Sequence, residues 1–122
     1  MLLVPARTVG RIQNRAACGQ LLRSRARASS GPVRATFAPV GAETPGVYPQ
    51  VGYAIGKHCG NAVVRNSLRR RMRESTRAVA PTLPRGTFLL RVEPAAAKAR
   101  PDVFVADVQR ALQRAAANGM KS

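Results

Sequence analysis

The sequence predicts an α+β protein, a two-layer α/β sandwich in which helices pack on one sheet, with elements in the order α-β-β-α-β-α. Two observations carry this prediction. Short segments alternate apolar and polar side chains with the period of two that is typical of strands, and longer segments repeat apolar side chains at helical spacing. The chain has 122 residues, of which 45% are apolar, which is enough for one domain with a modest core.

The first half of the chain is predicted to hold one helix and two strands. Residues 1–10 are expected to form a flexible lead, and residues 11–24 an amphipathic helix with Ile12, Cys18 and Leu22 near one face. The elements that follow are a basic linker at 25–31, a strand at 32–40, a turn-rich hairpin loop at 41–47 and a strand at 48–56. The hairpin loop would make these two strands neighbours in the sheet.

The second half is predicted to hold two long helices with a strand between them. The first helix covers residues 61–79, because Asn61 is a suitable N-cap and Pro81 and Pro84 prevent continuation. The elements that follow are a strand at 87–92, a loop at 93–101, and a helix at 102–119 with Asp102 at its start and Gly119 just past its end. We therefore expect a single domain at 11–119 and a short tail at 120–122.

Charge is the most unusual property of the composition. The chain has 21 Lys and Arg against five Asp and Glu, a formal net charge of +16. Self-repulsion of this size destabilises a small folded domain, so a polyanionic partner is expected.

Several other functions lack their residues in this sequence. Cys18, Cys59 and the one histidine, His58, do not have metal-ligand spacing, and the carboxylates are too scattered for a two-metal nuclease site. The N-terminus has no signal-peptide apolar region, and no segment is long enough to span a membrane. We therefore expect a soluble, cytoplasmic protein without a membrane partner.

The helix at 61–79 separates its apolar and cationic side chains. At about 100° per residue, an apolar stripe occupies an arc of roughly 80°, and an adjoining arc of roughly 140° is cationic. The stripe consists of Val64, Leu68, Met72, Ser75 and Val79, and the cationic arc of Arg65, Asn66, Arg69, Arg70, Arg73 and Arg77. A solvated face would mix charge signs, whereas like charges at i,i+4 cost about 0.2–0.5 kcal/mol each. The arc therefore favours nucleic-acid binding over a simple solvated face.

The segment GKHCGNA leads into this helix and adds a second anion-binding feature. Lys57 and the helix N-terminus both attract anions, and Gly60 allows close backbone approach. The amide of Asn66 can donate and accept, so it suits a phosphate, a base edge or a metal-bound water, although it can equally be a tolerated surface residue.

The stretch VGYAIGKHCGNAVVRNSLRRRMRE, residues 51–74, resembles the signature of the bacterial ribonuclease P protein component. That family shows V-G-x-x-x-S-K-K-x-G-N-A-V-x-R-N-x-x-K-R-x-x-R. The matching positions, without gaps, are Val51, Gly52, Lys57, Gly60, Asn61, Ala62, Val63, Arg65, Asn66, Arg70 and Arg73, with Arg69 in place of the usual Lys. The motif covers about a fifth of the chain, and the order of elements extends the likeness across the rest.

The resemblance implies a subunit of a ribonucleoprotein endonuclease that removes the 5′ leader of precursor tRNA. The RNA subunit cleaves with magnesium, no protein side chain is catalytic, and no obligate protein partner is needed. The fold would contain a left-handed βαβ crossover. Residues expected to bind RNA are Lys57, Asn61, Arg65, Asn66, Arg69, Arg70, Arg73 and Arg77. Residues expected in the leader cleft are Tyr53, Ile55, Cys18, Thr36 and Phe37. No direct metal ligand is expected, with indirect magnesium contact assigned to Asn66.

The chain also departs from the family pattern. Gly56 replaces the usual Ser, Ser67 stands where a basic residue is common, and Cys18 takes the place of an aromatic on the first helix. A leader cleft without aromatic platforms would bind single strands more weakly, by roughly 1–3 kcal/mol per base. The alternative function is a ribosomal or other structured-RNA-binding protein. A membrane-surface helix would need a bulkier apolar stripe than this one.

Overall fold

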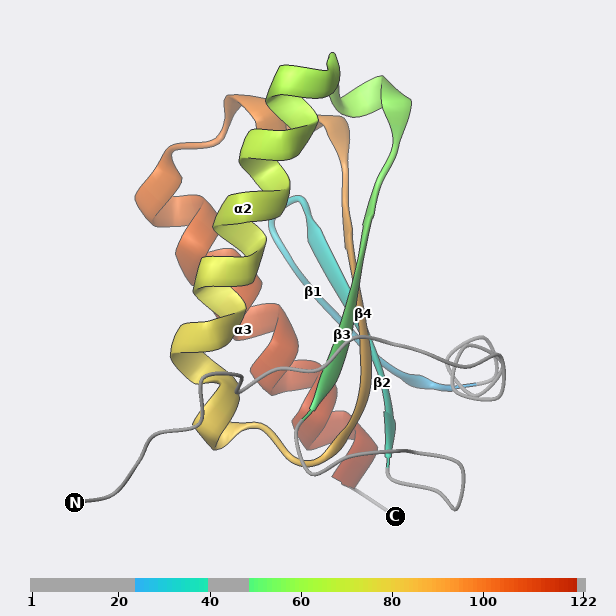
Figure 1. The fold of residues 1–122 in the computed structure, drawn as a ribbon. Helices are drawn as coiled ribbons and strands as arrows, with labels where there is room; N and C mark the ends of the chain where they lie inside the picture. Colours follow the sequence, from blue (N-terminus) through green and yellow to red (C-terminus); the bar gives the residue numbers. More distant parts are fainter. Residues whose placement is uncertain (1–23, 40–48, 121–122) are drawn as a thin grey trace, which may run out of the picture.

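The computed structural model describes residues 24–39 and 49–120. Within these ranges the chain forms a mixed sheet with two long helices on one of its faces, giving two layers (Figure 1). The strands and α-helices are β1 (Ala26–Ser30), β2 (Val33–Pro39), β3 (Gln50–Ile55), α2 (Ala62–Val79), β4 (Gly86–Val92) and α3 (Pro101–Met120). Short 3₁₀ segments connect them: η1 (Lys57–Cys59), η2 (Ala80–Thr82) and η3 (Pro94–Lys98). The α+β sandwich is confirmed.

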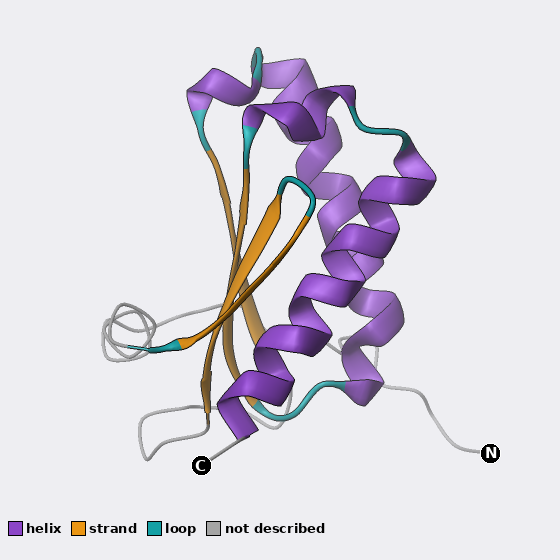
Figure 2. Cartoon of the chain, turned by 180° about the vertical axis from the view of Figure 1, so that it is seen from behind, coloured by secondary structure: helices purple, strands orange, loops and turns teal. Residues whose placement is uncertain are grey.

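The sheet has the strand order β1-β2-β4-β3. The β1/β2 and β2/β4 pairs are antiparallel, and β3 runs parallel to β4. In Figure 1 β3 lies in front of β4 while α2 lies to the left of both, so the β3–α2–β4 connection is left-handed. Such connections are right-handed in most proteins. Figure 2 shows the same layers from behind, with the β1–β2 hairpin nearest the viewer.

Alternation along the strands places one set of side chains beneath the helices. Phe37 of β2 and Phe88 of β4 are register partners, and their rings stack with centroids 4.5 Å apart. The helices cover this layer with their apolar stripes, of which the one on α2 was predicted. The buried stripe residues are Leu68, Met72 and Ser75 on α2, and Phe104, Val108, Leu112 and Ala115 on α3. One continuous core therefore joins the two layers.

The start of α2 is fixed by a side-chain cap. The Asn61 Oδ1 accepts the backbone N–H of Val64 at 3.0 Å, which satisfies one of the free donors of the first turn. Gly60 precedes it with φ of 143°, a conformation that favours glycine. The predicted N-cap is confirmed.

Two predictions in the first half were wrong. The supposed linker at 25–31 contains β1, which pairs with β2 through the turn at Gly31 and Pro32. The supposed neighbours β2 and β3 are separated by β4, so the segment between them is not a hairpin loop. Small polar residues concealed β1, because ARASS lacks the β-branched and aromatic side chains that mark strands.

Smaller differences concern the C-terminal half. Gly119 lies inside α3, which continues to Met120, and a Cβ at this position would collide with the ring of Phe37. Close packing of helix on strand therefore accounts for this glycine, and a C-terminal cap does not. The segment at 93–101 contains the η3 turn. The predicted lead at 1–10, the predicted helix with Cys18 except its last residue, Ser24, and the last two residues of the chain lie outside the described ranges.

Neither of the helices described is long and apolar enough to cross a membrane.

Candidate nucleic-acid interface

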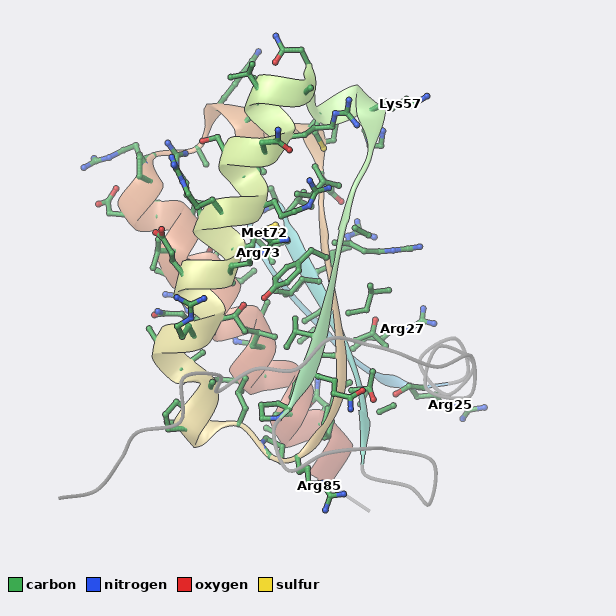
Figure 3. The ribbon with its side chains drawn as sticks, viewed as in Figure 1. Arg25, Arg27, Lys57, Met72, Arg73 and Arg85 are labelled. Carbon is green, nitrogen blue, oxygen red and sulfur yellow. The ribbon has the colours of Figure 1, made fainter. Side chains whose placement is uncertain are left out.

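The cationic arc of α2 forms a continuous surface, which we call the arginine face. It consists of Arg65, Asn66, Arg69, Arg70, Arg73 and Arg77. Its position follows from neighbours on either side of the helix. Ser75, on the opposite flank, accepts a hydrogen bond from Gln109 of α3 through its carbonyl at 3.3 Å. Arg73 and Arg77 lie instead close enough to Tyr53 of β3 to affect its ionisation, and Figure 3 shows Arg73 between α2 and β3. The arginine face therefore borders the edge strand β3, away from α3.

The arginines differ in how firmly they are held. Arg70, Arg73 and Arg77 are exposed, while Arg65 and Arg69 are half-buried where the face meets the core. The Arg69 Nη1 donates to the Asn66 Oδ1 at 3.2 Å, which ties the one amide of the face to a guanidinium. Fixing a guanidinium before a ligand arrives reduces the entropy cost of binding.

Tyr53 of β3 lies between the arginine face and the sheet. Burial raises the pKa of its hydroxyl above the usual value, and the hydrogen bond with Thr76 and the charges of Arg73 and Arg77 partly offset this. Tyr53 is thus a neutral hydroxyl at physiological pH, held beside two cations on the helix side of the sheet.

Three of the described carboxylates form ion pairs away from the arginine face, and Glu74, on α2 itself, forms none. Glu93 pairs with Arg34 at 2.6 Å, Asp102 with Arg100 at 3.4 Å, and Asp107 with Arg110 at 3.5 Å. No carboxylate in the described ranges forms an ion pair with the arginine face. Its positive charge is therefore left for an external polyanion, as the sequence predicted.

The segment before α2 holds an exposed lysine and no catalytic pair. Lys57 and His58 are exposed on η1, and Figure 3 shows Lys57 pointing away from the sheet. Cys59 turns inward, with its thiol 3.7 Å from the carbonyl of Val92, so it does not face His58. In the part of the chain described, no three His, Cys, Asp or Glu side chains come together as a metal site.

The residues assigned to a leader cleft do not share one surface. Phe37 is 0% exposed in the core, so its assignment was wrong. Tyr53 and Ile55 pair in register with Leu90 and Val92, which places them on the helix side. Thr36 lies on the opposite side of the sheet, which we call the open face. Cys18 lies outside the described ranges.

The open face carries cations that sequence reasoning missed. One row across the sheet consists of Ser29, Arg34, Arg91 and Ala54, and the next of Arg27, Thr36, Leu89 and Gly52. Arg27, Arg34 and Arg91 are exposed, and Figure 3 shows Arg27 on the side of the sheet away from the helices. The signal was present, because single arginines interrupt the strands within VRATF and LLRV at the positions that alternate with buried ones.

A small α+β domain with cations gathered on one helix face and one sheet face has the architecture of a nucleic-acid-binding protein. The chain belongs to the ribonuclease P family, because the model of the family described as "Ribonuclease P" matches residues 7–116. This match confirms the resemblance that the motif at 51–74 suggested.

Individual relatives agree with the family match. The chain is 44% identical over 70 residues to the ribonuclease P protein component of Salinispora tropica, covering 57% of this chain and 48% of that protein. It is 40% identical over 67 residues to the component of Acidothermus cellulolyticus, covering 54% and 56%. The chain thus spans about half the length of the curated relatives it matches.

Solved structures support the fold. The RNase P protein from Staphylococcus aureus superposes with a TM-score of 0.72 at 16% identity, covering 84% of this chain and 92% of that one. The protein from Thermotoga maritima gives 0.70 at 17% identity, covering 85% and 96%. At these identities the likeness shows a shared fold.

Proposed function

We propose that this chain is the protein subunit of ribonuclease P. It binds the catalytic RNA subunit through the arginine face and Lys57, and it assists removal of the 5′ leader from precursor tRNA. The observation that carries this proposal is the arginine face itself. Five guanidinium groups on one side of α2 have no carboxylate partner among the residues described, and the family motif coincides with that helix face.

The protein contributes binding and positioning, and the RNA performs the cleavage. The three carboxylates that form ion pairs lie at separate places in the fold, and each already neutralises an arginine. General acid–base catalysis on a phosphodiester would need proton-transferring side chains that converge on one point, whereas the side chains that this chain gathers on one face are cations. Electrostatic stabilisation of closely packed RNA phosphates is the contribution that such cations make.

Magnesium is proposed as the cofactor of the RNA-catalysed reaction. The arginine face does not suit direct coordination, because the Asn66 Oδ1 already accepts from Arg69 and the groups around it are cationic. Magnesium prefers carboxylate and phosphate oxygens. Any ion near Asn66 would therefore have RNA phosphates as its main ligands, with the amide contacting a bound water.

The open face is the surface we assign to the 5′ leader. Its cations (Arg27, Arg34 and Arg91) follow neighbouring strands, and Gly52 and Ala54 leave space above β3. No aromatic side chain lies in the two described rows of this face, so contacts would run to phosphates more than to bases. We expect leader binding that is weak and largely indifferent to sequence, in a cytoplasmic ribonucleoprotein with no other obligate protein.

Reconstitution tests the proposal. The protein is mixed with a bacterial ribonuclease P RNA and a precursor tRNA at low millimolar magnesium, and release of the 5′ leader is followed. Cleavage that the protein accelerates at this magnesium concentration supports the subunit function. Tight RNA binding with no effect on cleavage would support the alternative, a ribosomal or other structured-RNA-binding protein.

A further inference from the structure

Two arginines stand directly opposite each other on the open face. Arg34 of β2 and Arg91 of β4 are register partners in an antiparallel pair, so both side chains leave the sheet on the same side. Like charges in this arrangement destabilise a sheet. Arg34 is paired with Glu93 at 2.6 Å, whereas Arg91 forms no ion pair or hydrogen bond with any residue described. Of these two neighbouring guanidinium groups, only that of Arg34 therefore has a carboxylate partner among the residues described.

A pocket of about 520 Å³ lies beside this pair. Arg34, Arg91 and Glu93 line it together with Ala54, which follows Arg91 in the same row across the sheet. The small side chain of Ala54 leaves room for a ligand between Arg91 and the edge of the sheet.

His58 forms another wall of the pocket. Its imidazole folds back so closely over Gly56 that a Cβ at that position would collide with the ring. The family's usual serine could not stand at residue 56 with His58 in this position. The departure from the family pattern at Gly56 and the shape of the pocket are thus linked.

The Arg34–Glu93 contact is easily exchanged. The two side chains are 67% and 46% exposed, and ion pairs at such exposure are weak and screened by salt. A phosphate offers the same geometry to a guanidinium as a carboxylate does, and it can engage Arg34 and Arg91 together. An incoming phosphate would therefore compete directly with Glu93.

We propose that this pocket binds one phosphodiester group of single-stranded RNA, and that Glu93 is a built-in competitor that must release Arg34 first. The inference rests on the proposed function, because it places this step on the surface assigned to the leader. Its consequence is selectivity: a free single strand binds the open face poorly, whereas the leader of a precursor tRNA, held nearby by the RNA subunit bound to the arginine face, displaces Glu93. The contact then forms mainly within the assembled complex.

The test uses the whole chain and an unstructured oligouridylate of about eight nucleotides, with binding measured by fluorescence anisotropy at several salt concentrations. Glu93→Gln keeps the size of the side chain and removes the competitor. We expect roughly two- to fivefold tighter binding, the range that corresponds to a weak exposed ion pair. The log–log salt slope should steepen by about 0.7, one further phosphate contact on a single strand.

Asp102→Asn is the matched control. Asp102 is also an exposed acid paired with an arginine, but it lies at the start of α3, so it changes the net charge by the same amount elsewhere. Equal tightening by the two variants would show a net-charge effect alone and would overturn the proposal. Adding Arg91→Gln to Glu93→Gln should cancel the gain, and a gain that survives would also overturn it.

The proposal and the function beneath it can fail separately. If the protein does not support cleavage with ribonuclease P RNA, but Glu93→Gln tightens binding to the oligouridylate and Asp102→Asn does not, the pocket proposal is supported and the subunit function is contradicted. If the protein supports cleavage, but Glu93→Gln and Asp102→Asn change the affinity for the oligouridylate equally, the subunit function is supported and the pocket proposal is contradicted.

Discussion

Asn61 is assigned two roles, one structural and one in RNA binding, and stability measurements can test the structural role separately. Its side chain accepts the Val64 N–H as the N-cap of α2, and it is also an expected RNA contact. Asn61→Ala should lower the free energy of unfolding by about 1 kcal/mol, the usual cost of losing such a cap. Asn61→Asp keeps an acceptor and should retain the stability in urea unfolding. Equal stability of all three proteins would show that the cap does not contribute.

Tyr53 gives the fold a dependence on alkaline pH. Its pKa is raised in the folded state, first by burial, so the folded protein retains the phenol proton at pH values where the unfolded chain loses it. Its contribution to stability is therefore complete below about pH 10 and is lost as the pH rises through the raised pKa. Urea unfolding between about pH 9 and pH 11 should show this decline, and Tyr53→Phe should flatten it. A decline of the same steepness in Tyr53→Phe would assign the effect to other groups.

A shift of one residue decides which side chains of a strand meet a ligand. Thr36 and Phe37 are neighbours in sequence, yet one lies on the open face and the other is fully buried. The family resemblance placed both residues in the leader cleft. The register with β4, where Phe37 meets Phe88, puts them on opposite faces of the sheet, and this pairing joins segments about fifty residues apart.

The two flanks of α2 allow a matched test of the arginine face. Arg73 is exposed on the face, and the half-buried Arg71 lies, by helix geometry, on the other flank of α2. Arg73→Ala should weaken binding to ribonuclease P RNA by about fivefold, the loss of roughly 1 kcal/mol from one phosphate contact, with no change in the melting temperature. Arg71→Ala should leave the affinity within twofold. Equal weakening by both variants would mean that general charge, and no particular face, governs binding.

The α3 helix covers the free edge of β1. Arg114 donates to the carbonyl of Ser29 at 3.3 Å, and Asn118 donates to the carbonyl of Arg27 at 3.0 Å. These carbonyls are two residues apart and point away from β2, so side chains of α3 occupy the groups that a further strand would use. The helix thereby protects an edge strand from pairing with another chain.

Removing this cover should loosen the hairpin. Arg114→Ala combined with Asn118→Ala should lower the free energy of unfolding by about 1–2 kcal/mol and speed amide hydrogen exchange in β1. Self-association measured by light scattering should also rise with protein concentration. Gln113→Ala, a change to an exposed residue of the same helix, is the control. Unchanged exchange in β1 would show that these contacts are not formed in solution.

At the scale of the molecule, sequence reasoning was most successful where the signal is local. The helices α2 and α3 and the strand β4 appeared within one or two residues of their predicted bounds, because caps, prolines and periodicity are encoded nearby. The strand order could not be predicted, because inserting β4 between β2 and β3 depends on contacts distant in sequence. The left-handed crossover came from the family resemblance, since handedness leaves no mark on periodicity.

The central claim is that the arginine face binds RNA phosphates, and the salt dependence of binding to ribonuclease P RNA tests it most directly. Five or six neutralised phosphates predict a log–log slope of roughly −4 to −5 for the unaltered protein. The double change Arg70→Ala and Arg73→Ala removes two exposed guanidinium groups of the face and should make the slope shallower by roughly 2. A flat slope for the unaltered protein, or the same slope for both proteins, would contradict the account.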